Sequence, residues 1–118
     1  MVEAKCHCGA VRLELPEAPQ AVFECNCSIC RKLGVLWAYY QMPDIRIHAA
    51  PEATFTYVWN ERVLAFYHCR TCGCTTHWAA VEPGHPRMGM NARLIEGLSK
   101  KTTPVHHFDG GQTGLFWT

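Results

Sequence analysis

The chain has 118 residues, of which 48% are hydrophobic and 18% charged, and its formal net charge is +1. This length predicts a single domain over residues 1–118, and the balanced charge offers no general attraction for nucleic acid or an anionic membrane surface. Because neither a signal peptide nor a run of roughly 18 apolar residues is visible, we expect no membrane span and a cytoplasmic location.

The N-terminal part of the chain predicts short strands and one helical turn. Apolar residues alternate with charged ones over residues 10–15, which is typical of a half-buried strand, and residues 21–24 predict a second strand. Residues 28–33 favour one or two helical turns with Ser28 as the N-cap. Gly34 supplies the stop.

The middle of the chain is rich in β-formers. The aromatic run 36–42 favours a strand, and residues 45–48 predict a brief one. Two further β-rich runs, 54–59 and 63–69, flank the polar residues 60–62 and form the clearest hairpin pattern of the chain.

The C-terminal part is less regular. Residues 75–81 predict a strand, and the segment 88–95 fits either a strand or a short helix. The tail from residue 100 onward mixes polar residues with a few apolar ones. Taken together, the patterns predict a mainly β protein.

All eight cysteines fall in three clusters. These are Cys6 and Cys8, then Cys25, Cys27 and Cys30, and finally Cys69, Cys72 and Cys74. An even number of cysteines in a short chain is also compatible with disulfides. The spacing favours a metal, because Cys-x-Cys and Cys-x-x-Cys pairs place thiols around one ion and would strain most local disulfides. Gly9 and Gly73 follow cysteines where such a turn must be tight.

Structural zinc takes four ligands in a tetrahedron, so eight thiols divide naturally into two sites, and we expect two Zn²⁺ per chain. The simplest division joins Cys6 and Cys8 to Cys69 and Cys72, and leaves Cys25, Cys27 and Cys30 with Cys74. If Cys74 reaches the second metal, that site is closed. If it points away, the site keeps three thiolates and an open position.

Other residues near the clusters have two interpretations each. Four cations flank the thiols and either offset the negative charge of thiolates or form a solvated surface: Lys5, Arg31, Lys32 and Arg70. Three histidines neighbour thiols and either replace a ligand or, as the pattern favours, stay hydrogen-bonded or exposed imidazoles: His7, His68 and His77.

Read together, the three clusters resemble the family of glutathione-dependent formaldehyde-activating enzymes and centromere protein V. The matching segments are Cys-His-Cys-Gly-Ala-Val at 6–11, Cys-Asn-Cys-Ser-Ile-Cys-Arg-Lys at 25–32, and His-Cys-Arg-Thr-Cys-Gly-Cys at 68–74. The resemblance covers about two thirds of the chain.

The resemblance implies a β-tent fold, a zinc-bound pair of packed antiparallel sheets shared with methionine sulfoxide reductase B. It implies a structural zinc on the cysteines at 6, 8, 69 and 72, and a second zinc at the catalytic residues Cys25, Cys27 and Cys30. The founding enzymes of the family join glutathione and formaldehyde into S-hydroxymethylglutathione, a reaction classed as that of a carbon-sulfur lyase.

Two functions follow as hypotheses. The first is an enzyme that binds a small thiol such as glutathione and an aldehyde, with candidate carboxylate clamps at Arg31, Lys32, Arg62 and Arg93 and candidate aromatic walls at Trp37, Tyr39, Tyr40 and Trp78. The alternative is a non-catalytic, zinc-stabilised module that binds a protein or small ligand. Core packing competes with the wall role for every aromatic residue.

Overall fold

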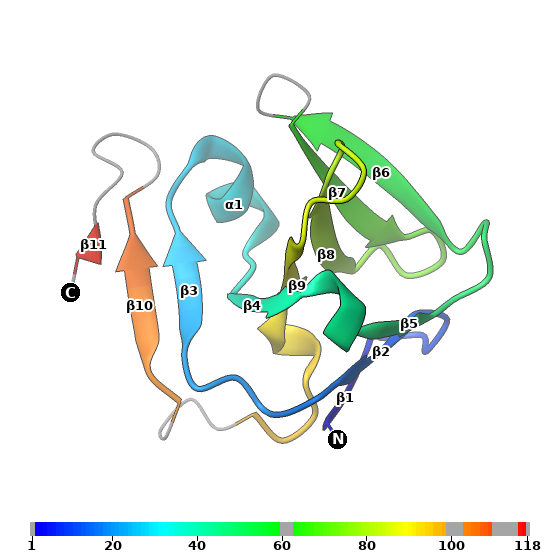
Figure 1. The fold of residues 1–118 in the computed structure, drawn as a ribbon, viewed down its shortest axis with the longest axis horizontal. Coiled ribbons are helices and arrows are strands. Elements are labelled where there is room, and N and C mark those ends of the chain that lie inside the picture. The colour runs from blue at the N-terminus through cyan, green and yellow to red at the C-terminus, as the bar shows by residue number, and fades with distance from the viewer. Residues whose placement is uncertain (1, 60–62, 99–102, 110–115, 118) are drawn as a thin grey trace.

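The computed structural model describes residues 2–59, 63–98, 103–109 and 116–117. In this part of the chain, two sheets account for most of the ordered structure (Figure 1). The smaller sheet has three strands in the order β1 (Val2–Lys5), β2 (Arg12–Leu15) and β5 (Arg46–His48). The larger sheet has eight strands in the order β11 (Phe116–Trp117), β10 (Val105–Phe108), β3 (Val22–Cys25), β4 (Trp37–Gln41), β9 (Arg87–Asn91), β8 (Thr75–Ala80), β7 (Leu64–Cys69) and β6 (Thr54–Trp59). The predicted fold class, mainly β with two sheets, is confirmed.

One strand pair departs from the antiparallel pattern. Among the described strands, only β3 and β10 run parallel, with Val22 opposite Val105 and Cys25 opposite Phe108. A backbone hydrogen bond from the N–H of Asn26 to the carbonyl of Phe108 extends this pairing beyond the strands. The C-terminal part of the chain therefore lies beside the strand that leads into the central cysteine cluster.

The helical elements are short, and no helix in the described part of the chain could cross a membrane. They are α1 (Ser28–Leu33) and the 3₁₀ turns η1 (Met42–Asp44) and η2 (Ala92–Leu94). Gly34 ends α1 as predicted, since its φ of 69° lets its N–H bond to the carbonyl of Cys30. The N-cap is Cys27, so the expectation of Ser28 at that position was wrong by one residue.

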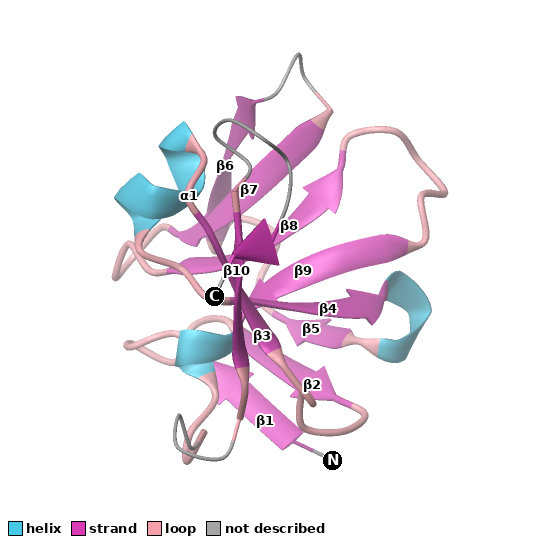
Figure 2. Cartoon of the chain, turned by 90° about the vertical axis from the view of Figure 1, so that its left-hand side faces the viewer, coloured by secondary structure: helices cyan, strands magenta, loops and turns pink. Residues whose placement is uncertain are grey.

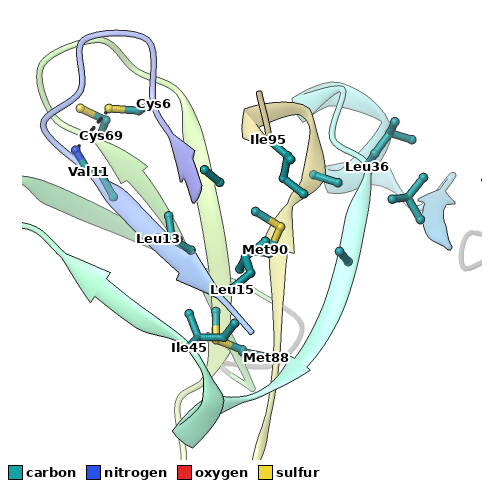
Figure 3. Packing of buried hydrophobic residues seen from close by; sticks show 14 residues of the cluster. Cys6, Val11, Leu13, Leu15, Leu36, Ile45, Cys69, Met88, Met90 and Ile95 are labelled. Carbon is teal, nitrogen blue, oxygen red and sulfur yellow. Dashed lines mark hydrogen bonds between the residues drawn. The ribbon is translucent and has the colours of Figure 1, made fainter. Parts of the chain in front are cut away.

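The two sheets pack on one hydrophobic core (Figure 3). Leu13 and Leu15 of β2 face Met88 and Met90 of β9, and each of these four side chains is fully buried. Burying a side chain of this size stabilises a fold by roughly 1.5–3 kcal/mol. Because successive side chains in a strand point to opposite faces, only alternate residues of the large sheet enter this core.

The other residues of the large sheet form a second cluster on its opposite face. Trp37 and Tyr39 of β4 pack there with Cys30 of α1, whereas the intervening Ala38 joins the core between the sheets. Phe66 of β7 lies in the same second cluster. In Figure 2, α1 lies at the same end of the molecule as β6 and β7, whereas β1 and β2 lie at the other end.

Several predicted strands are confirmed, with ends that differ by one or two residues. The segment 88–95 combines both predicted alternatives, since β9 is followed at once by the turn η2. Strands β1, β10 and β11 were not predicted. The predicted hairpin forms, because Trp59 pairs with Leu64, although its turn at residues 60–62 lies outside the described residues.

Candidate metal centres

Four cysteine sulfurs gather at one end of the core between the sheets. They belong to Cys6, Cys8, Cys69 and Cys72, called below the four-cysteine group, and all lie within 4.8 Å of one another. The sulfur of Cys8 is 3.7 Å from that of Cys6 and 3.6 Å from that of Cys69. A tetrahedron with metal–sulfur bonds of about 2.3 Å has edges of about 3.8 Å, so these spacings fit one zinc ion.

Two tight turns bring these thiols together from the N-terminal part and the middle of the sequence. Gly9 and Gly73 both adopt the left-handed conformation, with φ of 84° and 81°. Their N–H groups bond to the carbonyls of Cys6 and Cys69, which closes each turn. The backbone N–H of Val11 also donates to the sulfur of Cys6 at 3.4 Å (Figure 3). Such N–H donors stabilise negative charge on sulfur.

Backbone N–H groups also donate to the sulfurs of Cys69 and Cys72 in the four-cysteine group. The backbone N–H of Cys72 bonds to the sulfur of Cys69 and lowers the pKa of that thiol. Burial raises the pKa of Cys72, but hydrogen bonds from the backbone N–H groups of Cys74 and Cys8 outweigh it and bring that pKa to about 5. Thiolates are the form that binds a metal. This turn is therefore suited to hold a cation.

A second group of three thiols lies on the opposite face of the large sheet. Cys25 ends β3, Cys27 caps α1 and Cys30 lies in that helix, and the three sulfurs lie within 4.8 Å of one another. The N–H of Cys27 donates to Cys25 at 3.5 Å, and the indole N–H of Trp37 donates to Cys30 at 3.3 Å. We call this set the three-cysteine group.

Burial raises the pKa of both Cys25 and Cys30. Desolvation disfavours a thiolate, and three negative charges this close would repel one another. A cation among the sulfurs would offset both effects, so this donor set also fits a soft divalent metal such as zinc.

Cys74 does not join the three-cysteine group. Its thiol interacts with Cys72 and Cys6, beside the four-cysteine group. The reason is the turn at Gly73 and the hydrogen bond from the N–H of Cys69 to the carbonyl of Cys74, which keep the whole segment in one knuckle. Of the two alternatives that the sequence left open for Cys74, the structure has the one in which it points away.

All eight cysteines lie in the described part of the chain, and each is a free thiol. The sulfur separations of 3.6 and 3.7 Å in the four-cysteine group are far longer than the roughly 2.05 Å of a disulfide. This arrangement therefore differs from the disulfide alternative.

The two buried histidines, His68 and His77, form hydrogen bonds with threonine hydroxyls and not with the thiols. His68 bonds to the hydroxyl of Thr75 at 3.1 Å, and His77 bonds to that of Thr76 at 2.9 Å. His77 also stacks on the ring of Tyr67, and burial lowers its pKa to about 4, so it is neutral at pH 7. No histidine belongs to either candidate metal group in the described residues.

An aromatic pocket of about 280 Å³ opens directly onto the three-cysteine group. Beside the three thiols, its lining is Ile29, Trp37, Tyr39, Trp59, Leu64, Phe66, Trp78 and Phe108. Three of the four predicted wall residues are among them. The fourth, Tyr40, points to the other face of the sheet, where its hydroxyl donates to the carbonyl of Glu17 at 2.9 Å.

A second cavity of about 250 Å³ is lined by two of the three thiols, Cys25 and Cys30. Arg31 and Arg93 line it, together with Glu24, and we call it the arginine pocket. The guanidinium of Arg93 is held in place by a 2.8 Å hydrogen bond to the carbonyl of Gly34. Of the other predicted clamps, Lys32 is exposed and does not line this pocket, and Arg62 lies outside the described residues.

Several residues of the pocket lining were not predicted. Phe66 and Leu64 share a face of β7, and Trp59 lies opposite Leu64 in the hairpin, so their alternation could have placed them together. Phe108 had no such signal. It reaches the pocket only through the parallel pairing of β10 with β3.

Comparison with known proteins identifies a family for this chain. The family model of the glutathione-dependent formaldehyde-activating enzyme matches residues 1–108. The chain belongs to this family. The resemblance predicted from the three cysteine segments is therefore confirmed.

A solved structure shares the fold of this chain. The crystal structure of a Rhodobacter sphaeroides protein, determined by structural genomics, superimposes with a TM-score of 0.71 at 29% sequence identity. The match covers 87% of this family member and 98% of the other chain. The fold is therefore shared over nearly the whole of that protein.

We predict that Cys69→Ser costs the fold as well as one metal ion. Zinc binding to sites of this type contributes roughly 10–16 kcal/mol, which is as large as the whole stability of a typical domain. Metal content and circular dichroism test this. The matched control is Cys74→Ser, which should keep both metals and the native melting temperature, and a folded Cys69→Ser protein that retains two zincs would refute the four-cysteine site.

We further predict that Gly89→Ala distorts the aromatic pocket. A Cβ on Gly89 would overlap the indole Nε1 of Trp78 and lie 2.8 Å from its Cε2. Overpacking of this kind costs roughly 1–3 kcal/mol. The melting temperature and tryptophan fluorescence report it. In a Trp78→Phe background the same substitution should cost less, and an equal cost in both backgrounds would mean that the indole is not the obstacle.

Proposed function

We propose that this chain is a zinc-dependent enzyme of the carbon-sulfur lyase type that acts on the adduct of glutathione, or another small thiol, with an aldehyde. The observation that carries the proposal is the difference between the two groups. One has four thiols, enough to close a structural site, and the other has three thiols beside an open pocket. Residues 1–118 would act as one zinc-binding domain, and the reduced thiols suit the cytoplasm.

The residues at the open site fit a catalytic zinc. Cys25, Cys27 and Cys30 would hold it, and the ion would supply positive charge that favours the thiolate form of a bound thiol at neutral pH. The N–H donors of Cys27 and Trp37 keep the protein sulfurs oriented. The surrounding aromatic rings exclude water, which strengthens these electrostatic interactions.

The reaction needs few groups beyond these. The thiol loses its proton, its sulfur attacks the carbonyl carbon of the aldehyde, and a carbon–sulfur bond forms while the carbonyl electron pair moves to oxygen. That oxygen then takes up a proton. Tyr39 lines the pocket, and burial raises its pKa to about 12, so its phenol stays protonated and is a suitable hydrogen-bond donor to the oxygen.

The arginine pocket is an argument that the bound thiol carries a carboxylate. Arg31 and Arg93 are exposed cations within the lining of a cavity that also contains Cys25 and Cys30. Guanidinium groups bind carboxylates through paired hydrogen bonds. Glutathione, whose central residue bears the thiol and whose two ends bear carboxylates, suits this arrangement.

We expect Cys30→Ser to lose the second zinc and the catalysis while the fold survives. Even an outer partner of a metal ligand changes activity by about 10–100-fold, so loss of a ligand should reduce the rate by more than about 100-fold. The measurement is the rate of S-hydroxymethylglutathione formation above the spontaneous reaction, with metal content determined in parallel. Cys74→Ser serves as the control and should keep full activity.

The binding-module alternative makes the opposite forecast. Two zincs per chain, no rate above the spontaneous reaction and no measurable thiol binding would favour it over the enzyme. Thiol binding without turnover would retain the ligand class and reject the reaction.

A further inference from the structure

Arg87 stands at the outer end of the pocket face and has no role in the site described so far. It begins β9 and is exposed, and its guanidinium carbon lies 4.3 Å from the centre of the Tyr39 ring. Within the described residues, no carboxylate lies within ion-pair distance of it. Stacking on Tyr39 holds this cation over the same aromatic surface that lines the three-cysteine group.

Two cavities that share lining residues lie between Arg87 and the cysteines, and together we call them the groove. A cavity of about 310 Å³ is lined by Phe23, Tyr39, Trp78, Arg87 and Phe108. Three of these residues also line the aromatic pocket: Tyr39, Trp78 and Phe108. The groove therefore starts at three thiols, passes over aromatic rings and ends at a cation.

The charge of the groove indicates that its ligand carries a negative charge near Arg87. Arg87 is the charged side chain in the lining of the 310 Å³ cavity, and the rest of that lining is aromatic. Glu17 lines an adjoining cavity of about 430 Å³ with Arg87, but the two do not form an ion pair. A carboxylate in the groove would gain a paired hydrogen bond from a guanidinium that now bonds to no acid in the described part of the chain.

We infer that Arg87 anchors a carboxylate of the thiol substrate and so makes the site selective for acidic thiols. This inference rests on the proposed function, because it assumes that the thiol sulfur lies at the three-cysteine group. It assigns a second carboxylate position, on the far side of the aromatic pocket from Arg31 and Arg93. A ligand with one central thiol and two acidic ends would engage both.

The test compares two ligands and three variants of the zinc-loaded full chain. The ligands are glutathione and its diethyl ester, which keeps the thiol and the length but masks both carboxylates. The variants are Arg87→Leu, Arg87→Lys and, as a matched control, Arg46→Leu, which removes an exposed arginine from β5 in the other sheet. Binding is measured by calorimetry and by quenching of tryptophan fluorescence, independently of turnover.

Arg87→Leu should raise the Kd of glutathione by about tenfold, because one charge-assisted hydrogen-bond pair at an exposed site is lost. The Kd of the diethyl ester should not change. Arg87→Lys should recover part of the affinity, since it keeps the charge without the planar fork. Arg46→Leu should match the native protein with both ligands.

Three outcomes overturn the inference: an unchanged Kd for glutathione in Arg87→Leu, an equal loss for both ligands, or no binding of glutathione to the native chain. The proposed function is tested separately, by measuring turnover. Catalysis by a native protein whose affinity does not depend on Arg87 rejects this inference alone. A selective loss of affinity without any turnover rejects only the reaction.

Discussion

The meeting of two glycine turns at one end of the core is the constraint on which the rest of the structure depends. Cys8 and Cys69 are 61 residues apart, yet their sulfurs lie 3.6 Å apart. This contact joins the turn between β1 and β2 to the turn between β7 and β8, and so fixes the small sheet against the large one. Thiolates at this distance repel one another, which is why a cation and the fold would stabilise each other.

Given that arrangement, the alternation of strand residues places the core on one face of the large sheet and the three-cysteine group on the other. One face of β4 and β9 contributes Ala38, Met88 and Met90 to the core between the sheets. The other face presents Trp37 and Tyr39 to the three-cysteine group. Gly89 belongs to this second face, and its missing side chain is what lets the indole of Trp78 pack directly against the backbone of β9. The core between the sheets and the three-cysteine group are thus separated by one layer of backbone.

The asymmetry of the two thiol groups has a local cause. The knuckle at residues 69–74 carries three cysteines, but its turn at Gly73 keeps Cys74 on the side of the four-cysteine group. The central cluster is left with the three sulfurs that its own strand end and helix supply. Four donors suffice for a closed tetrahedral site, whereas three beside a pocket leave room for a ligand. The groove toward Arg87 extends that room along the sheet.

The sequence by itself determined the features whose causes are local. Cysteine spacing and the following glycines predicted the knuckles, alternation predicted most strands, and Gly34 predicted the end of α1, because each depends on residues a few positions apart. The strand β10 with Phe108 and the position of Arg87 over Tyr39 were decided only by the tertiary structure. These depend on which strands pair and in what register, and pairing is set by the free energy of packing distant segments together, which no short pattern contains.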